Sequence, residues 1–378
     1  MQFSGCLTDR VQAGNGCTSR DWAGDGYESS VFILHSGPVL RNVYSAGFFM
    51  PKLLDTYSRH INYLRISVTD RCNLRCMYCM PKEGISLIGH SEVLSYEEII
   101  RVAKNAALNG ITKIRITGGE PLVRKGINDF VSELYRTPGI TELSLTTNGI
   151  LLEACAESLY RAGIKRINIS LDTLNPEKYK KITRGGDIDA VIAGIRKARE
   201  VGFSPIKINV VAMRTVNDDE VLDFARLTID RPVHIRFIEF MPVAGQATSQ
   251  QARFISSLEL QQKIRTIGEL TPLDMDKSAG PASMFQLQGA QGKLGFINAM
   301  SNHFCATCNR LRLTADGKLR PCLFSDNEID LKPLLRGGCS DTELTAIIEQ
   351  AIQSKPRQHT MFEPAYKKCG RNMSAIGG

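Results

Sequence analysis

The chain has 378 residues, enough for two domains or for one large α/β barrel with an added segment, which excludes a peptide or a mini-protein. Hydrophobic residues make up 43% and charged residues 23%, as in folded proteins with a sizeable core, so global disorder is excluded. The formal net charge of +8 is spread along the chain and suits an anionic small molecule as well as nucleic acid.

No apolar run approaches the ~18 residues of a membrane helix, and the N-terminus lacks the apolar stretch of a secretory signal. We therefore expect a soluble, cytoplasmic protein that does not enter a membrane. In a reducing compartment, clustered cysteines indicate metal ligands or reactive thiols before they indicate disulfides. Six of the eleven cysteines are clustered, in two groups that lie far apart in the sequence.

Residues 1–49 contain no lysine and show little periodicity. We predict that they form a poorly ordered N-terminal extension, which is either a real leader or lies upstream of a true start at Met50. The patterned sequence divides into residues 50–242, where strands and helices alternate, and residues 243–378. The second part begins with loops and shorter elements and contains the second cysteine group.

From Ile61 onward, short β-branched runs alternate with longer helical stretches, which is the pattern of repeated βα units around a parallel sheet. The six predicted strands are Tyr63–Thr69, Thr112–Thr117, Glu142–Thr147, Arg166–Asp172, Ile206–Met213 and Val233–Phe240. The predicted helices are Ser95–Asn109, Ile127–Arg136, Glu153–Ala162, Ile188–Val201 and Asp218–Thr228, with a final helix at Asp341–Ser354.

Apolar and polar residues alternate along these strands, and in a barrel one set faces the outer helices while the other faces the lumen. The inward set contains five cations: Arg65, Lys113, Arg115, Lys207 and Arg236. The solvated face of an antiparallel sheet shows the same alternation, but the intervening helices argue against that alternative. Burying like charges without a partner costs several kcal/mol each, so a basic lumen indicates a polyanionic ligand such as a triphosphate.

Cys72, Cys76 and Cys79 form a C-x3-C-x2-C run directly after the first predicted strand. In a βα barrel, the loops that follow the strands form the active-site face. A [4Fe-4S] cluster usually takes four cysteines, so three thiolates leave one iron open to a small ligand. A structural zinc site would instead favour four ligands in paired C-x2-C units.

This run, with Tyr78 before its last cysteine, resembles the signature of the radical S-adenosylmethionine (SAM) superfamily. In that superfamily the open iron binds SAM, and the reduced cluster cleaves SAM to methionine and a 5′-deoxyadenosyl radical. The run Gly118-Gly119-Glu120-Pro121, one βα unit later, is similar to the superfamily's GGEP element. The resemblance implies that Gly118, Gly119 and Glu120 contact SAM.

Cys305, Cys308 and Cys322 form a C-x2-C-x13-C group that again supplies three thiolates. On these residues alone two alternatives stay open. In one, His303 completes a Cys3His zinc site. In the other, the three thiolates hold a second cluster with an open iron.

Residues 51–378 closely resemble the GTP 3′,8-cyclase family. The matching stretches are Tyr63–Pro81, Ile114–Pro121, Leu145–Gly149, Ile167–Asp172, Ile235–Met241, Phe304–Leu313 and Gly377-Gly378. The resemblance implies an α/β fold, namely an incomplete (β/α)6 TIM-like radical SAM barrel with a C-terminal extension that carries a second [4Fe-4S] cluster. It also implies the conversion of GTP to (8S)-3′,8-cyclo-7,8-dihydroguanosine 5′-triphosphate, the first step of molybdenum cofactor biosynthesis.

The resemblance further implies roles for individual residues. The first cluster belongs to Cys72, Cys76 and Cys79, and the second, whose open iron holds guanine, to Cys305, Cys308 and Cys322. SAM contacts are also implied for Tyr78, Ser170 and Met241. GTP contacts are implied for Arg65, Arg115, Thr146, Lys207, Arg310, Leu311 and Arg312, and catalytic roles for Arg65, Arg115, Arg236, Gly377 and Gly378. The sequence departs from the family at Ser58-Arg59, where a Gly-Arg pair is usual, and residues 243–256 are not distinctive.

For partners, the resemblance implies a downstream cyclic pyranopterin monophosphate synthase, an electron donor that the sequence does not identify, and a homodimer, with no nucleic-acid or membrane partner. Two other functions are considered. A radical SAM maturase that modifies peptides also carries auxiliary clusters, but such enzymes generally have more C-terminal cysteines. A zinc-stabilised nucleic-acid-binding protein would not explain the GGEP element or the inward cations.

Overall fold

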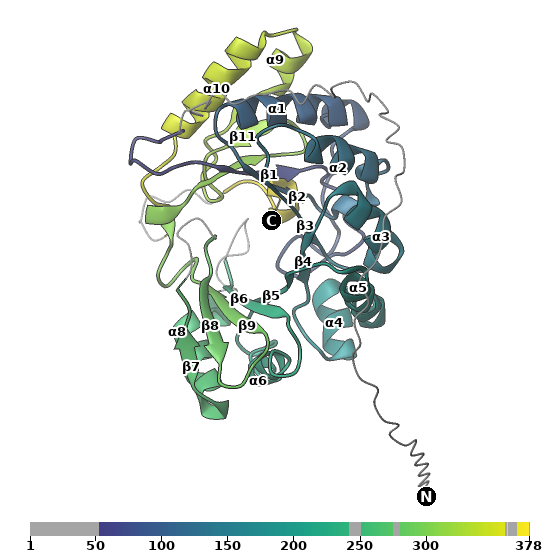
Figure 1. Cartoon of the computed structure of the whole chain (residues 1–378), viewed down its shortest axis with the longest axis vertical. Helices are drawn as coiled ribbons and strands as arrows, with labels where there is room; N and C mark the ends of the chain where they lie inside the picture. The colour runs from purple at the N-terminus through teal and green to yellow at the C-terminus, as the bar shows by residue number, and fades with distance from the viewer. Residues whose placement is uncertain (1–52, 242–250, 275–279, 360, 362–368, 378) are drawn as a thin grey trace, which may run out of the picture. The chain divides into compact units, whose positions relative to one another are not determined.

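The computed structural model describes residues 53–241, 251–274, 280–359, 361 and 369–377, so the predicted extension at residues 1–49 lies outside the described residues. Within the described residues, twelve strands form one sheet in the order β12-β11-β10-β1-β2-β3-β4-β5-β6-β9-β8-β7 (Figure 1). The six predicted strands are β1 (Tyr63–Ser67), β2 (Lys113–Thr117), β3 (Glu142–Thr147), β4 (Arg166–Ser170), β5 (Ile206–Ala212) and β6 (His234–Glu239). Each begins and ends within two residues of its prediction, and the α/β fold class is confirmed.

Strands β1 to β6 are parallel and follow chain order, because each is joined to the next by a helical crossover. The crossover helices are α1 (Tyr96–Leu108), α2 (Ile127–Tyr135), α3 (Leu152–Ala162), α4 (Pro176–Thr183), α5 (Ile188–Val201) and α6 (Val221–Arg226). They lie on the outer side of the curved sheet (Figure 1). The sequence prediction missed α4, although its Asn175-Pro176 start is a recognised helix-start signal.

The hydrophobic core lies between the sheet and these helices. On β1 and β2, Leu64, Ile66, Ile114 and Ile116 are at most 1% exposed and belong to one apolar cluster with residues of α1 such as Val102. The prediction that the apolar set faces the helices is therefore confirmed. The alternate positions are left to form the opposite, concave face of the sheet.

The C-terminal region adds strands to both edges of the six-stranded unit. β9 (Lys293–Ile297) pairs in parallel with β6, and β10 (Arg310–Leu313) pairs in parallel with β1. The sheet is extended by the antiparallel strands β7 (Leu270–Pro272), β8 (Ser283–Leu287), β11 (Lys318–Arg320) and β12 (Ile329–Asp330). Strands from both sides of the predicted division at residue 242 thus share one sheet, while the boundary itself lies outside the described residues.

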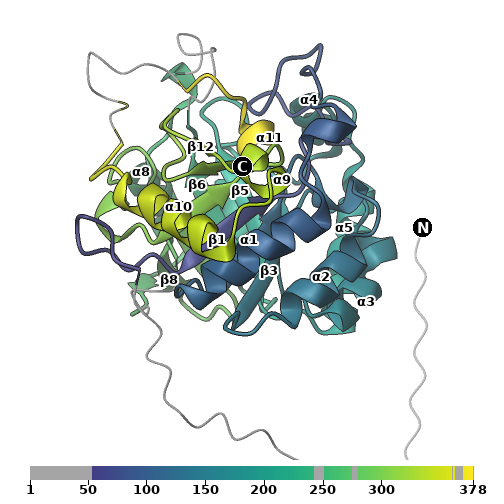
Figure 2. The same cartoon turned by 90° about the horizontal axis from the view of Figure 1, so that it is seen from above.

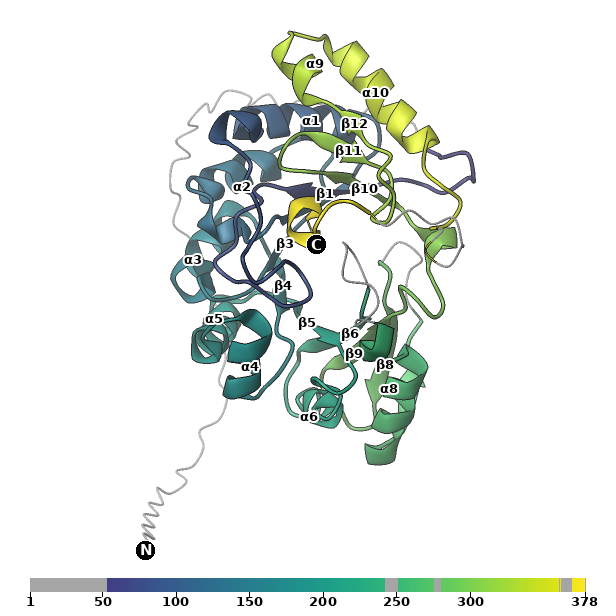
Figure 3. The same cartoon turned by 180° about the vertical axis from the view of Figure 1, so that it is seen from behind.

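The described part of the C-terminal region also contains the helices α8 (Ser257–Ile264), α9 (Lys332–Arg336), α10 (Asp341–Gln353) and α11 (Met373–Ile376). Short 3-10 helices lie at His90–Glu92, Pro121–Val123, Gln251–Arg253, Arg265–Ile267 and Cys305–Thr307. α10 lies alongside α1, where Arg101 pairs with Asp341 (Figure 2). α11 lies on the concave side of the sheet beside β1 (Figure 3). None of the helices in the described ranges is long and apolar enough to cross a membrane.

Candidate active site

Described residues on the concave side of the sheet line a cavity of about 550 Å³. Its wall contains both cysteine groups: Cys72, Cys76, Cys79, Cys305, Cys308 and Cys322. It also contains all five cations that strand alternation predicted to face inward: Arg65, Lys113, Arg115, Lys207 and Arg236. The prediction of a basic lumen is therefore confirmed.

Strand β1 sets the distance between the two cysteine groups. Cys72 follows the carboxyl end of β1, whereas Cys308 precedes β10, which is parallel to β1 with Arg310 opposite Tyr63. A strand rises about 3.3 Å per residue, so β1 separates the two groups by on the order of 15 Å. The first group therefore lies at the carboxyl ends of the parallel strands and the second lies toward their amino ends.

The end of α4 holds the loop that carries the first cysteine group. The Met77 N–H donates to the Ile182 carbonyl at 2.9 Å. The Arg184 guanidinium, directly after α4, donates to the carbonyls of Arg75 (3.2 Å) and Met80 (2.9 Å). The Ile182 carbonyl of α4 and the Arg184 side chain that follows α4 thus bind the backbone of the loop before, between and after Cys76 and Cys79.

The double-glycine turn after β2 packs directly on the backbone in front of Cys72. The Gly119 N–H donates to the Thr69 carbonyl at 2.6 Å, and the Glu120 N–H donates to the Arg71 carbonyl at 2.8 Å. A Cβ atom added to Gly119 would lie 2.3 Å from the Arg71 carbonyl oxygen. This position therefore requires glycine because the two backbones approach so closely.

The first cysteine group suits an iron–sulfur cluster. All three thiols are free, and burial raises their pKa, that of Cys79 to about 12. The neighbouring thiols raise the pKa of Cys76 and Cys79 further. Buried thiolates that repel one another are stable only beside positive charge, which a cluster supplies when each of three irons takes one thiolate.

Tyr78 is held in the wall of the cavity by Asp172 at the end of β4. The Tyr78 hydroxyl donates to the Asp172 carboxylate at 2.7 Å, and the Val211 N–H donates to its other oxygen at 2.8 Å. Burial raises the pKa of Asp172 to about 6, whereas these two hydrogen bonds lower it. Asp172 thereby connects the cysteine loop to β4 and β5.

The second cysteine group is surrounded by cations. Burial would raise the pKa of Cys308, but Arg310 and Lys355 beside it lower that pKa to about 6. The Arg310 guanidinium also lies 4.6 Å above the Phe304 ring. Lys355 was not singled out in the sequence, since it is an isolated lysine 33 positions after Cys322 and no local pattern marks it.

The described side chains at the second group do not converge on a site for a single metal ion. The His303 ring packs edge-on against the His359 ring, with 5.0 Å between the ring centroids. Among the described residues, no three His, Cys, Asp or Glu side chains converge closely enough to hold one metal ion. A cluster has a different requirement, because its thiolates bind separate irons and need not converge on a single point.

The inward cations destabilise one another. Burial, followed by the charges of Arg236 and Arg115, lowers the pKa of Lys207 to about 7. Burial also lowers the pKa of Arg236, to about 10, and that of Arg65. An anion in the cavity would offset this repulsion, so the site favours a ligand with several negative charges.

The other residues proposed from the sequence divide into four sets. Tyr78, Gly118, Gly119, Thr146, Ser170, Met241, Arg310 and Arg312 line the cavity. Gly377 is described and its carbonyl accepts hydrogen bonds from Arg65 (3.1 Å) and Arg312 (3.2 Å). Gly378 lies outside the described residues. Glu120 and Leu311 lie elsewhere.

Glu120 is not among the residues that line the cavity, and the SAM contact implied by the resemblance stays a prediction. Its carboxylate is buried and accepts hydrogen bonds from the Thr147 hydroxyl (2.8 Å) and from the N–H groups of Leu122 (3.0 Å) and Asn148 (2.7 Å). The side chain therefore supports the turn that presents Gly119.

Leu311 lies between two residues that line the cavity. Arg310, Leu311 and Arg312 are successive residues of β10, so their side chains alternate between the two faces of the sheet. Leu311 is 1% exposed and belongs to the core cluster beneath the helices. Its side chain does not line the cavity, and the contact with GTP implied by the resemblance stays a prediction for the backbone of this segment.

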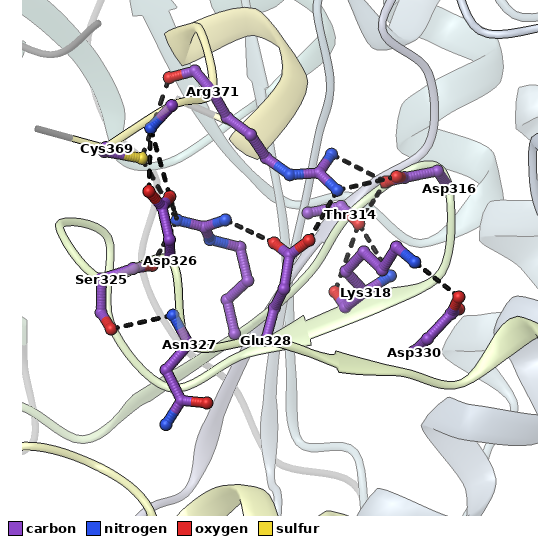
Figure 4. Close-up of polar contacts among 12 residues, drawn as sticks. Thr314, Asp316, Lys318, Ser325, Asp326, Asn327, Glu328, Asp330, Cys369 and Arg371 are labelled. Carbon is purple, nitrogen blue, oxygen red and sulfur yellow. Dashed lines mark hydrogen bonds and ion pairs between the residues drawn. The ribbon is translucent and has the colours of Figure 1, made fainter.

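The chain end is anchored by a network of ion pairs that the sequence analysis missed (Figure 4). Arg371 donates to both Asp316 oxygens (3.2 and 2.9 Å) and to Glu328 (2.7 Å). Arg320, which is fully buried, donates to Glu328 at 2.5 Å and to the Cys369 sulfur at 3.3 Å. These contacts hold residues 369–371 against β11 and β12 and so direct α11 and Gly377 toward β1.

The fold and the site define a radical SAM protein. Residues 66–228 match the family described as Radical SAM superfamily, and residues 233–361 match Molybdenum Cofactor Synthesis C. Crystal structures of SuiB from Streptococcus suis, bound to S-adenosylmethionine or to the precursor peptide SuiA, align with TM-scores of 0.52 and 0.53. The alignments cover 76% and 78% of this chain and 67% and 66% of SuiB at 16% and 17% identity, so they show a shared fold alone.

Similarity to proteins of established name identifies the family within the radical SAM proteins. The GTP 3′,8-cyclase of Moorella thermoacetica is 54% identical over 86% of this chain and 99% of its own length. Those of Pelotomaculum thermopropionicum and Thermodesulfovibrio yellowstonii are 50% and 53% identical over the same shares. The chain therefore belongs to the GTP 3′,8-cyclase family.

The close approach at Gly119 gives the first prediction. Gly119→Ala should displace the backbone before Cys72, lower the iron bound at the first cysteine group and reduce stability by about 1–3 kcal/mol. Iron content after anaerobic reconstitution and denaturant unfolding measure the two effects. Gly89→Ala is the matched control, since its added Cβ would meet only the Glu92 side chain at 3.9 Å. Full iron binding in Gly119→Ala would contradict this account.

The anchor of the chain end gives the second prediction. Arg371→Met removes charge-assisted hydrogen bonds of about 1.5–3 kcal/mol, so the amides of α11 should exchange with solvent about ten to a hundred times faster. Hydrogen–deuterium exchange of the C-terminal peptide measures this rate. Arg226→Met, which breaks an exposed pair with Asp223, should leave that peptide unchanged. Equal protection in both variants would show that Arg371 does not anchor α11.

Proposed function

We propose that the chain performs the reaction of its family in the cavity between its two cysteine groups. It converts GTP to (8S)-3′,8-cyclo-7,8-dihydroguanosine 5′-triphosphate in molybdenum cofactor biosynthesis, and it uses SAM and two [4Fe-4S] clusters. The observation that carries the proposal is the placement of two three-thiol groups at opposite ends of one cavity whose wall also contains the five predicted inward cations. This arrangement provides separate places for SAM and for a nucleotide triphosphate.

Residues at the carboxyl ends of the strands would bind SAM. When bound, the cluster at the first group supplies the electron that cleaves SAM to methionine and a 5′-deoxyadenosyl radical, and the cluster at the second group supplies an open iron for guanine. Gly118 and Gly119 present bare backbone beside Cys72, while Tyr78, Ser170 and Met241 line the same end of the cavity.

The middle of the sheet would hold the triphosphate. Arg65 and Arg115 are direct neighbours on β1 and β2, and Lys207 and Arg236 project from β5 and β6 into the same cavity. Guanidinium groups bind phosphate oxygens in pairs and fix their orientation. Arg310 and Arg312 extend this set toward the second cysteine group. Together these side chains would orient the ribose between the two ends of the cavity.

The Gly377 carbonyl already contacts the cations Arg65 and Arg312. We propose that the Gly377-Gly378 end of the chain helps to position SAM and GTP, and that the cations move their hydrogen bonds from this carbonyl to the substrate or share them with it. The roles of Arg65, Arg115 and Arg236 in catalysis follow from the same position, since they neutralise the charge of the bound substrate.

The wider setting follows from the reaction. The product would pass to a cyclic pyranopterin monophosphate synthase, and both clusters require an external electron donor. Action in the cytoplasm, assembly as a homodimer, and the division into residues 1–49, 50–242 and 243–378 are proposals that rest on the family resemblance and the composition.

Anaerobic reconstitution followed by incubation with SAM, a reductant and GTP tests the function. We expect 5′-deoxyadenosine to form in a GTP-dependent manner together with the cyclised nucleotide, both measured by mass spectrometry. Cys76→Ala should abolish SAM cleavage, whereas Cys308→Ala should abolish the cyclised nucleotide but not SAM cleavage. If a peptide supported the reaction and GTP did not, the chain would be a maturase instead.

The lowered pKa of Lys207 predicts how GTP binding depends on pH. Its pKa is about 7 in the free protein and should rise when phosphates lie beside it, so binding takes up a proton above that pH. Affinity should be independent of this group below about pH 7 and fall by up to about tenfold per unit above it. Isothermal titration between about pH 7.5 and about pH 8.5, where the γ-phosphate is largely ionised and guanine N1 largely protonated, measures the slope. Lys207→Met should bind more weakly with a flatter profile, and an equal slope in both proteins would refute the assignment.

A further inference from the structure

The segment after α10 contacts every part of the chain that carries a ligand of the second group. We call residues 355–359 the strap. It begins at Lys355, two residues after α10 ends, and its carbonyls and side chains lie beside the loops of Cys305, Cys308 and Cys322. Nothing in the local sequence of the strap indicates this role.

Lys355 joins two of these loops. The residue is 3% exposed, and its ammonium donates to the Arg310 carbonyl at 2.8 Å and to the Pro321 carbonyl at 2.6 Å. Arg310 is two residues after Cys308, and Pro321 directly precedes Cys322. One buried cation therefore holds together two segments that are separated by the β10–β11 hairpin.

Arg59 joins the third loop to the same strap. It is 7% exposed, and its guanidinium donates to the Cys305 carbonyl at 2.8 Å. It also donates to the carbonyls of Pro356 (2.7 Å) and Arg357 (3.0 Å), while Asp55 accepts from its Nε at 2.6 Å. The planar guanidinium uses its fork geometry to hold several oxygens at once.

The two cations differ in what balances their charge. Arg59 has a carboxylate partner in Asp55. Lys355 lines the same part of the cavity wall as Cys308 and Cys322, and it donates to the carbonyls of Arg310 and Pro321 beside them. A buried ammonium without a counterion costs several kcal/mol. The thiolates of the second group, with the cluster they bind, are therefore its natural counterion.

We propose that Lys355 is a positioning residue of the second cluster: it fixes the loops of two cysteine ligands and stabilises the negative charge of the cluster, while Arg59 fixes the third. The inference rests on the proposed assignment of this cluster to Cys305, Cys308 and Cys322. A cluster with three thiolates is an anion whose negative charge grows on reduction, so a nearby cation favours the reduced form. Removal of the cation should make the reduction potential more negative.

Lys355→Met keeps the length of the side chain and removes its charge. After anaerobic reconstitution of the full chain, we expect either loss of one cluster's iron and sulfide or a second cluster with a more negative potential. Electron paramagnetic resonance during redox titration separates the two clusters, because added SAM changes the spectrum of the first one only. Lys263→Met, which breaks a surface pair with Asp218, is the control and should match the unmodified protein.

Arg59→Lys keeps the charge but removes the fork. It should lower the occupancy of the second cluster without changing the potential of the fraction that assembles. Circular dichroism verifies folding in each variant. Unchanged occupancy and potential of the second cluster in Lys355→Met would overturn the role of Lys355, and full occupancy in Arg59→Lys would overturn the role of Arg59.

Cys308→Ala, studied in parallel, separates this inference from the function on which it rests. If Cys308→Ala loses one cluster while Lys355→Met retains both with unchanged potentials, only the inference fails. If Cys308→Ala retains both clusters, the ligand assignment and with it the proposed function fail.

Discussion

Positive charge buried in a single cavity is the constraint on which the rest of the structure depends. Arg65, Lys207 and Arg236 are each no more than 9% exposed, and their lowered pKa values show that burial and mutual repulsion disfavour their charged forms. The same strands offset this cost by burying a continuous apolar face against the helices. A site that is unfavourable when empty becomes favourable when a polyanion enters it, so the stability of the free protein and its affinity for substrate oppose each other.

The C-terminal region belongs to the catalytic framework because of its two parallel strands. β10 and β9 pair with the edge strands β1 and β6, so the second cysteine group is positioned by the sheet itself. Around it, isolated side chains such as Lys355 and Arg59 bind backbone carbonyls, and at the chain end Arg371 binds carboxylates. The strands thus set the distance between the two cysteine groups, and buried cations fix the loops that carry the cysteine ligands.

Local sequence patterns were sufficient to predict the six central strands and the inward cations, because alternation with period two survives in any strand that is buried on one side. The pairing of β10 with β1 was not predictable, since it joins strands of four and five residues that are more than 240 positions apart. The orientation of the Glu120 side chain was not predictable for a different reason. The GGEP motif identifies the residue, but it does not show that the Thr147 hydroxyl and the Asn148 N–H donate hydrogen bonds to its carboxylate. Lys355 and Arg371 bind partners that are distant in sequence, so no spacing rule singles them out.

The parallel pairing of β1 with β10 fixes the distance between the two cysteine groups of the cavity. This distance depends on the rise per residue of a hydrogen-bonded strand, which is far stiffer than a loop. The cavity would therefore select its ligands by length as well as by charge. One residue inserted into either strand would lengthen the span by a single peptide unit. It would also turn the side chains beyond the insertion to the opposite side, placing guanidinium groups among leucines and isoleucines.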